Sequence, residues 1–447
     1  MQKKILLIGS GPLPFEGEGI RNAGGLRTEQ FLSPLTKGQY EVFSILIHSE
    51  ALPKEQKEED GSFRISRSDP FLFRQIRHKI KNFSPDICIA VNTFPSFVAA
   101  KTLPKETPFW ADLNGWIMAE AQVRAGETGS NALIPNSWHQ EKTVLLRADK
   151  VSTVSTPQRF ATIGELASIG RIRKETNNYD FVTSIPNATK KFALDEELLP
   201  LREIRKEKGI PEGATVISFI GGYNNWVDEK SLFEGLEKAM ARDEKVFFVS
   251  TGGNIDKIAT GVFGRFQERI RQSKYKNRFV FLGWIATKDM ASVYNASDIG
   301  ISTDILCTET ETGARNRINE MMKFGLPVIT TSGSEIAERV AQYECGLVAA
   351  SGNSDEIAEK ILILSRDETL RKKYGENGKQ IVENIFHEDL LFKPIEEFIL
   401  SQKIAPDRAL RALDMNGGIL SFLKGAFSYG RQNGIPAFFK KIFQYFV

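Results

Sequence analysis

The segment with the most chemical content is residues 312–331, where two arginines and a carboxylate meet the start of a predicted helix. Arg315 and Arg317 fall in the first turn of a helix expected over 315–324, and Glu320 follows about one turn later. A helix N-terminus is already partly positive and usually attracts acidic residues. Arginines at that position favour a site for an anion, most often a phosphate. The alternative is a solvated helix start with two surface arginines.

A second such segment is the glycine turn at residues 221–228, which follows an apolar strand and opens a helix expected over 229–240. Open α/β sheets bind ligands at the carboxyl ends of their strands, where glycines let the backbone come close. Together with the arginines, this turn predicts a pocket for a nucleotide diphosphate, with Glu320 accepting hydrogen bonds from the ribose hydroxyls. Trp226 is either a lid over the nucleotide or a core aromatic. The candidate donor-binding residues of this half are Gly222, Asn225, Trp226, Lys230, Arg317 and Glu320.

A third glycine-rich turn, at residues 9–14, follows the first predicted strand, and Gly24 and Gly25 precede a helix expected over 26–35. The glycine spacing is not that of a dinucleotide-binding fingerprint, and no acidic residue stands at the end of the next strand. The pattern therefore argues against a nicotinamide-dependent oxidoreductase.

Bulk properties narrow the class of protein further. A chain of 447 residues is too long for one ordinary core, so two domains are expected. The formal net charge of +3, without a basic tract, gives no support for nucleic acid as a partner. Three distant cysteines and four scattered histidines show no disulfide framework and no metal-ligand spacing, so we expect no metal and no other cofactor. No segment reaches the roughly 18 apolar residues of a membrane span, and the expected location is the cytoplasm or the inner face of the cell membrane.

Strand-like apolar runs alternate with helical patterns along most of the chain, which predicts parallel sheets covered on both faces. In the first half, strands are expected at 5–8, 41–47, 87–91, 109–113, 151–154 and 181–185. In the second half, they are expected from 215 and at 246–250, 279–282, 299–302, 328–331 and 346–348. The predicted fold class is α/β, with two successive doubly wound domains.

The expected domain limits follow from shifts in composition. The division is an N-terminal domain at 1–190, a polar linker at 191–208, a second domain at 209–385, a helix at 386–405 that returns to the first domain, and a basic aromatic tail at 406–447. Such a tail is suited to a membrane interface, with aromatics in the lipid and cations near anionic headgroups. The alternative is a helix pair packed on the first domain or on another chain.

Several motifs carry a resemblance to a known family. Residues 320–329 resemble the core motif Glu-Ala-Met-Ala-x-Gly-x-Pro-Val, and residues 281–284 and 345–348 match the order of elements around it. Gly24 and Gly25 resemble the paired glycines of its first domain. From residue 1 to about 400, the chain is similar to the retaining glycosyltransferases of the GT-B fold, a bacterial family that builds surface polysaccharides. A narrower resemblance is to a subgroup with Gly-Gly-x-x-x-Trp-x-Asp, in which an arginine-bearing segment replaces the first family glutamate.

The resemblance implies two Rossmann-like domains facing a cleft, with a helical tail after them. It implies a hexosyl- or deoxyhexosyltransferase that moves a sugar from a nucleotide-diphosphate sugar to a hydroxyl of a glycan or lipid-linked glycan, with retention and without a metal. The donor would bind mainly to the second domain, with Gly24 and Gly25 contributing from the first, and the acceptor would bind mainly to the first domain. Arg315 would then stabilise charge on the departing phosphate.

The sequence departs from this family at the first of its paired glutamates. These fall on positions 312 and 320, but position 312 is Thr. Glu309 and Glu311 are near, and Glu311 is the candidate for the missing carboxylate. A catalytically silent GT-B protein that binds a glycan or protein partner is therefore an alternative, and a GT-B nucleotide-sugar epimerase is another.

On the acceptor side, relatives often carry a histidine at the strand end occupied here by residues 111–113. Asp112 and Glu120 are thus the candidates for orienting the acceptor hydroxyl. A purely structural role for Asp112, capping the following turn, is the alternative.

Overall fold

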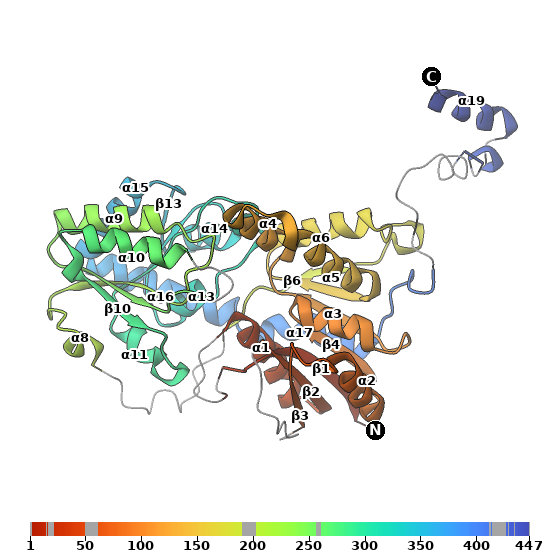
Figure 1. The fold of residues 1–447 in the computed structure, drawn as a ribbon, viewed down its shortest axis with the longest axis horizontal. Coiled ribbons are helices and arrows are strands. Elements are labelled where there is room, and N and C mark those ends of the chain that lie inside the picture. The colour runs from red at the N-terminus through yellow and green to blue at the C-terminus, as the bar shows by residue number, and fades with distance from the viewer. Residues whose placement is uncertain are drawn as a thin grey trace.

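Two α/β domains lie side by side in the computed structural model, each built around its own parallel sheet (Figure 1). The structure describes residues 2–14, 16, 22–49, 61–189, 203–255, 261–410, 413, 426–427, 429–432 and 434–446. The predicted α/β fold of two doubly wound domains is confirmed.

The first domain holds a seven-stranded parallel sheet with the order β3-β2-β1-β4-β5-β6-β7. Its strands are β1 (Lys3–Gly11), β2 (Tyr40–His48), β3 (Ser62–Ser66), β4 (Ile87–Val91), β5 (Phe109–Leu113), β6 (Lys150–Thr153) and β7 (Val182–Ser184). Its helices are α1 (Ala23–Lys37), α2 (Leu72–Phe83), α3 (Thr93–Thr102), α4 (Ile117–Thr128), α5 (Ile134–Arg147) and α6 (Thr156–Ser168). Strands β4 and β5 are buried along their whole length, as expected for a sheet covered on both faces.

The second domain repeats the same winding in a six-stranded sheet with the order β10-β9-β8-β11-β12-β13. Its strands are β8 (Thr215–Phe219), β9 (Val246–Thr251), β10 (Phe279–Gly283), β11 (Ile299–Ser302), β12 (Val328–Thr331) and β13 (Gly346–Ala349). Its helices are α8 (Ile204–Glu207), α9 (Glu229–Arg242), α10 (Val262–Gln272), α11 (Met290–Asn295), α12 (Thr308–Thr312), α13 (Asn316–Lys323), α14 (Glu335–Gln342), α15 (Ser354–Arg366) and α16 (Glu368–Asn384). Most of the predicted linker, residues 191–202, lies outside the described residues.

Helix α17 (Glu388–Ser401) follows the second domain in sequence but packs on the first. Ile395 and Ile399 are buried against Ile5 and Leu7 of β1, and the ring of Phe398 meets that of Trp110 edge-on, with centroids 5.4 Å apart. The apolar face of α17 thus completes the core of the first domain.

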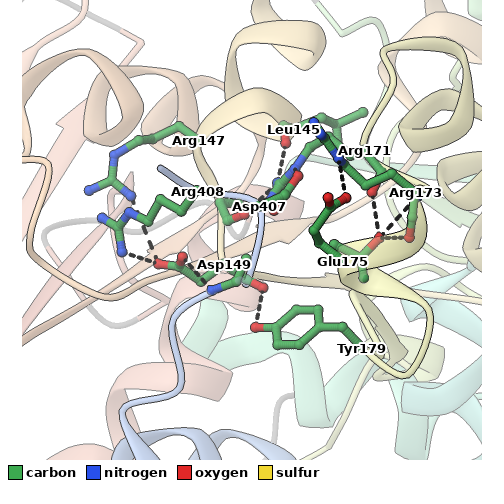
Figure 2. A network of polar contacts seen from close by, with 12 residues as sticks. Leu145, Arg147, Asp149, Arg171, Arg173, Glu175, Tyr179, Asp407 and Arg408 are labelled. Atoms are coloured by element: carbon green, nitrogen blue, oxygen red, sulfur yellow. Dashed lines mark hydrogen bonds and ion pairs between the residues drawn. The ribbon is translucent and has the colours of Figure 1, made fainter. Parts of the chain in front are cut away.

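Beyond α17, the chain is fastened to the first domain by a buried ionic network (Figure 2). Arg171 makes two hydrogen bonds to Asp407, at 2.7 and 2.8 Å, and Arg408 Nη1 donates to Asp149 Oδ2 at 2.7 Å. The backbone N–H of Ala405 also donates to Asp149, at 3.0 Å. Asp149 is fully buried, so these bonds replace the water that its carboxylate has lost. We call residues 405–408 with Asp149 and Arg171 the terminal clip.

Candidate active site between the domains

The strand order of each sheet reverses beside its first strand, and several of the candidate site residues lie at these two points. Strand β1 lies between β2 and β4, and β8 lies between β9 and β11. In open α/β sheets, ligands bind outside the carboxyl ends of the strands at such reversals.

In the second domain, the glycine turn after β8 meets the start of α13. Arg317 Nη2 donates to the carbonyl oxygen of Gly222 at 2.7 Å, and its guanidinium lies 4.2 Å from the ring centroid of Phe219. Nη1 of Arg317 is buried without a hydrogen-bond partner. Burial lowers the pKa of Arg317 to about 10, although Asp304 acts in the opposite direction. Arg317 therefore places a positively charged guanidinium at the turn, and its Nη1 is still able to donate a hydrogen bond.

Arg315 stands at the N-cap of α13 and is held by two carboxylates. Its Nε donates to Asp304 Oδ2 at 2.8 Å, and its Nη1 and Nη2 donate to the two oxygens of Glu309 at 3.0 and 2.7 Å. Burial by itself would lower the pKa of Arg315, but Asp304 and Glu309 raise it above the ordinary arginine value. The guanidinium also lies 5.3 Å from the ring centroid of Trp226. Arg315 is thus a fixed charge whose orientation is set by three neighbours.

This geometry corrects the predicted role of Glu311. Glu311 is exposed on α12, whereas Glu309 on the same helix is 5% exposed and forms the ion pair with Arg315. Thr312 is buried, with its hydroxyl donating to the carbonyl oxygen of Thr308 at 2.6 Å. The carboxylate that the structure brings to Arg315 is therefore that of Glu309.

Glu120 approaches this group from the first domain, on helix α4, which contacts α12. Burial, together with the negative charge of Glu309, raises the pKa of Glu120 to about 7. The structure thus brings Glu120, Glu309 and Arg315 together across the domain boundary, near the place where predicted acceptor and donor sites should meet.

Two further carboxylates lie behind Glu120, and the sequence analysis did not identify them. Glu141 on α5 is fully buried with neither carboxylate oxygen hydrogen-bonded, and Glu165 on α6 accepts a hydrogen bond from Trp116 Nε1 at 2.8 Å. Burial raises the pKa of Glu165 to about 7 and that of Glu141 well above the ordinary glutamate value, with mutual repulsion adding to the shift of Glu141. The three glutamates stand on three separate helices, so no sequence spacing connects them.

Among the described residues, no group of histidine, cysteine, aspartate or glutamate side chains is suited to hold a metal ion.

Asp112 occupies a different environment from the one predicted for it. The carboxylate is fully buried and accepts hydrogen bonds from Arg27 Nε and Nη2, at 3.0 and 2.7 Å, and from Ser152 Oγ at 2.6 Å. It therefore anchors α1 to β5 and β6 instead of facing an acceptor, and it does not cap the following turn.

The paired glycines of the first domain lie at the start of α1, beside the carboxyl end of β1. Asn22 Oδ1 caps the helix by accepting from the N–H of Gly25 at 2.6 Å, and Asn92 Nδ2 donates to the carbonyl oxygen of Gly24 at 3.0 Å. A Cβ on Gly25 would lie only 2.0 Å from the carbonyl oxygen of Pro12. Position 25 therefore accepts only glycine without a shift of the turn.

The remaining predicted donor residues divide into two groups. Asn225, Trp226 and Glu320 are half-buried at the glycine turn and on α13. Lys230 is exposed on α9 and lies 3.9 Å from Glu234, so its charge is directed to solvent and not to the turn. Trp284, which the sequence analysis had not selected, follows β10 and is 42% exposed, and a Cβ on Gly222 would lie 3.1 Å from its ring.

The two domains are in direct contact at this site. Ser155 Oγ donates to the carbonyl oxygen of Thr312, Thr156 N donates to Glu335 at 2.6 Å, and Asn319 Nδ2 donates to the carbonyl oxygen of Asn187 at 2.7 Å. Between them remains a cavity of about 20 Å³, whose lining includes Arg315. Such a volume holds about one water molecule.

Comparisons with known proteins match part of the chain to a family model and to a curated relative. Residues 201–381 match the family model of glycosyl transferases group 1, a range that contains the glycine turn, Arg315 and Arg317. The chain is 36% identical over 77 residues to the capsular polysaccharide biosynthesis glycosyltransferase CapM of Staphylococcus aureus. That match covers 17% of this chain and 20% of the relative, so the chain spans about a fifth of the curated relative it matches.

Solved structures resemble nearly the whole chain. Sucrose-phosphate synthase from Thermosynechococcus elongatus superposes with a TM-score of 0.67 at 14% identity, over 90% of this chain and 99% of that one. HepE from Anabaena, in complex with UDP-glucose, superposes with a TM-score of 0.65 at 16% identity, over 89% and 99% of the two chains. The fold of the chain is therefore GT-B.

Proposed function

We propose that the protein transfers a sugar from a UDP-linked donor to a hydroxyl of a glycan or lipid-linked glycan, with retention of anomeric configuration. The observation that carries the proposal is the state of Arg317: its guanidinium is bonded to Gly222 on one side, and Nη1 is buried without a partner on the other. An unsatisfied buried cation donor is costly unless an anion completes it.

The donor would bind across the glycine turn after β8 and the start of α13. Helix α13 has no side-chain cap at its N-terminus, so its first amides are suited to a phosphate. Arg317 would pair with the diphosphate, and Glu320 with the ribose. Trp284 exposes an aromatic surface beside Gly222 on which a base could stack. The matched family and the UDP-glucose held by HepE support a UDP-sugar as donor.

Transfer would use fixed charge in place of a covalent nucleophile. Arg315, oriented by Asp304 and Glu309, would stabilise charge that develops on the departing diphosphate. Glu120, which approaches Glu309 and Arg315 from the first domain, would contact the acceptor. Closure of the domains to the contact seen between Ser155 and Thr312 would exclude water as a competing acceptor.

The test is calorimetric titration of the full chain with UDP, GDP, dTDP and ADP, compared with Arg317→Gln and with Lys230→Gln. Both variants remove one positive charge from the second domain, but the charge of Lys230 is directed to solvent. We expect UDP to bind and Arg317→Gln to weaken it about 10- to 100-fold, which corresponds to the roughly 1.5–3 kcal/mol of a charged hydrogen bond. Lys230→Gln should change it less than about twofold. Equal effects of the two substitutions, or no nucleotide binding, would reject this site.

A second candidate is a catalytically silent GT-B protein, which Thr312 at the position of the first family glutamate favours. It predicts UDP binding with the same sensitivity to Arg317 but no release of UDP from a UDP-sugar with any glycan acceptor. An epimerase would convert the UDP-sugar without an acceptor, which nuclear magnetic resonance of the sugar detects directly.

A further inference from the structure

The C-terminal tail differs from the rest of the chain in charge and in exposure. From residue 415 to 447 it carries Lys424, Arg431, Lys440 and Lys441 and no acidic residue. Its last element is helix α19 (Ile435–Phe446), which stands apart from both domains (Figure 1). Short helical stretches at residues 426–427 and 429–432 precede it, and Phe427 meets Phe438 of α19 with ring centroids 6.3 Å apart.

The described part of this hairpin presents large apolar side chains to solvent. Ile435 is 72% exposed, Phe439 63% and Phe427 64%. In sequence, apolar residues recur in α19 at three- and four-residue spacing, at positions 435, 438, 439, 442, 443 and 446, while Lys440, Lys441 and Gln444 fall between them. That spacing assigns the apolar positions to one face of the helix and the polar ones to the other.

The point at which the tail leaves the first domain is also fixed. The terminal clip holds residues 405–408 to Asp149 and Arg171 (Figure 2). A Cβ added at Gly170 would lie 2.9 Å from Leu413, so the chain also stays against the first domain at that residue. Asp149 directly precedes β6, whereas Ser155, just beyond the other end of β6, contacts the second domain. The tail therefore leaves the first domain at the edge opposite the cleft.

We propose that the tail binds an anionic lipid surface as an interfacial anchor, with α19 lying in the plane of the interface. Among the described residues, no helix is long and apolar enough to cross a bilayer. A basic aromatic helix with one apolar face instead inserts that face at the headgroup boundary, and its cations attract anionic headgroups. The absence of any acid after Asp414 matches a negative surface.

The clip gives this anchor an orientation. A surface bound to the tail would hold the first domain at the edge away from the cleft, so that the second domain stays free to open and close. If the proposed function holds, the domain expected to bind the acceptor is the one tethered to the membrane. This consequence rests on that function, whereas the binding of lipid by the tail does not.

The experiment is flotation of the full chain with vesicles of phosphatidylcholine containing phosphatidylglycerol, and with vesicles of phosphatidylcholine alone. We expect flotation with the anionic vesicles, reduced at least about tenfold by Phe439→Asp. Gln432→Asp adds the same charge to the tail without removing an apolar side chain and should retain most of the binding. Lys440→Gln with Lys441→Gln should remove the preference for anionic vesicles.

Three results would overturn the proposal. One is no flotation of the full chain, and another is an equal loss in Phe439→Asp and Gln432→Asp. The third is a dimer, measured by light scattering, that Phe439→Asp converts to a monomer without affecting flotation, because the apolar face would then belong to a second copy. Titration of the same proteins with UDP, without vesicles, reports separately on the proposed function.

Discussion

Glu309 and Arg315 form a buried bidentate ion pair, with Nη2 of the arginine 2.7 Å from Oε2 of the glutamate. Both side chains are about 5% exposed, and Asp304 holds the remaining edge of the guanidinium. The pair lies on the second domain's side of the boundary where Ser155 of the first domain contacts Thr312. A charge in this position is fixed before any substrate binds, which is the property that electrostatic catalysis requires.

This pair predicts different outcomes for two neighbouring glutamates. Glu309→Gln should lower the turnover of a UDP-sugar about 10- to 100-fold, because Arg315 loses the partner that orients it. Glu311→Gln, at the exposed position of the same helix, should leave turnover within about twofold. Steady-state kinetics with release of UDP as the readout compares them. A larger loss in Glu311→Gln would restore the assignment based on the sequence.

Asp112 is predicted to act on stability and not on the acceptor. Asp112→Asn leaves the buried guanidinium of Arg27 without its counter-charge and should lower the free energy of unfolding by about 3 kcal/mol. Urea denaturation measures this loss, and the double variant with Arg27→Met should recover part of it because no buried charge is then unpaired. An Asp112→Asn protein of normal stability with a raised acceptor KM would instead show a contact with the acceptor.

The buried glutamates predict a pH-dependent stability. Burial raises the pKa of Glu165 to about 7, whereas in the unfolded chain it ionises near the ordinary value of about 4.5. Between these values the folded state retains a proton that the unfolded state has lost, so the free energy of unfolding falls as the pH rises from about 4.5 to about 7. The raised pKa of Glu120 likewise makes the free energy of unfolding fall as the pH rises.

Glu165→Gln removes this titration. As the pH rises from 5 to 8, the free energy of unfolding of the variant should therefore increase by about 2 kcal/mol relative to that of the unmodified chain. The exposed Glu244 supplies the control, because Glu244→Gln should follow the unmodified chain at every pH. Urea denaturation at a series of pH values gives the comparison. Parallel curves for Glu165→Gln and the unmodified chain would contradict the assignment.

Much of the fold could be predicted from the sequence because buried parallel strands are marked by apolar runs. The expected strands at 87–91, 109–113, 299–302 and 328–331 coincide with β4, β5, β11 and β12. Strand β3 was missed because it has only five residues, and three of them, Ser62, Arg64 and Ser66, are polar. Its assignment depends on pairing with β2, a contact that its local composition does not reveal.

The site was predictable only in part. Glycine turns and the two arginines were identified because their residue types stand at strand ends and at a helix start, which are local features. The structure pairs Glu309 with Arg315 instead of the predicted Glu311, because only one side of this five-residue helix faces Arg315. No spacing in the sequence connects Arg27 with Asp112, 85 positions away, or Glu120 with Glu141 and Glu165 on other helices.

The sequence by itself thus determined the α/β class, the presence of two doubly wound domains, the positions of the glycine turns and the basic aromatic character of the tail. All of these depend on residue type and short-range period. Only the tertiary structure decided which charges are paired, which carboxylates are buried, and where the tail is fastened. Those properties depend on distances between elements remote in sequence, and the loss of water at their contacts sets the energy of each charge.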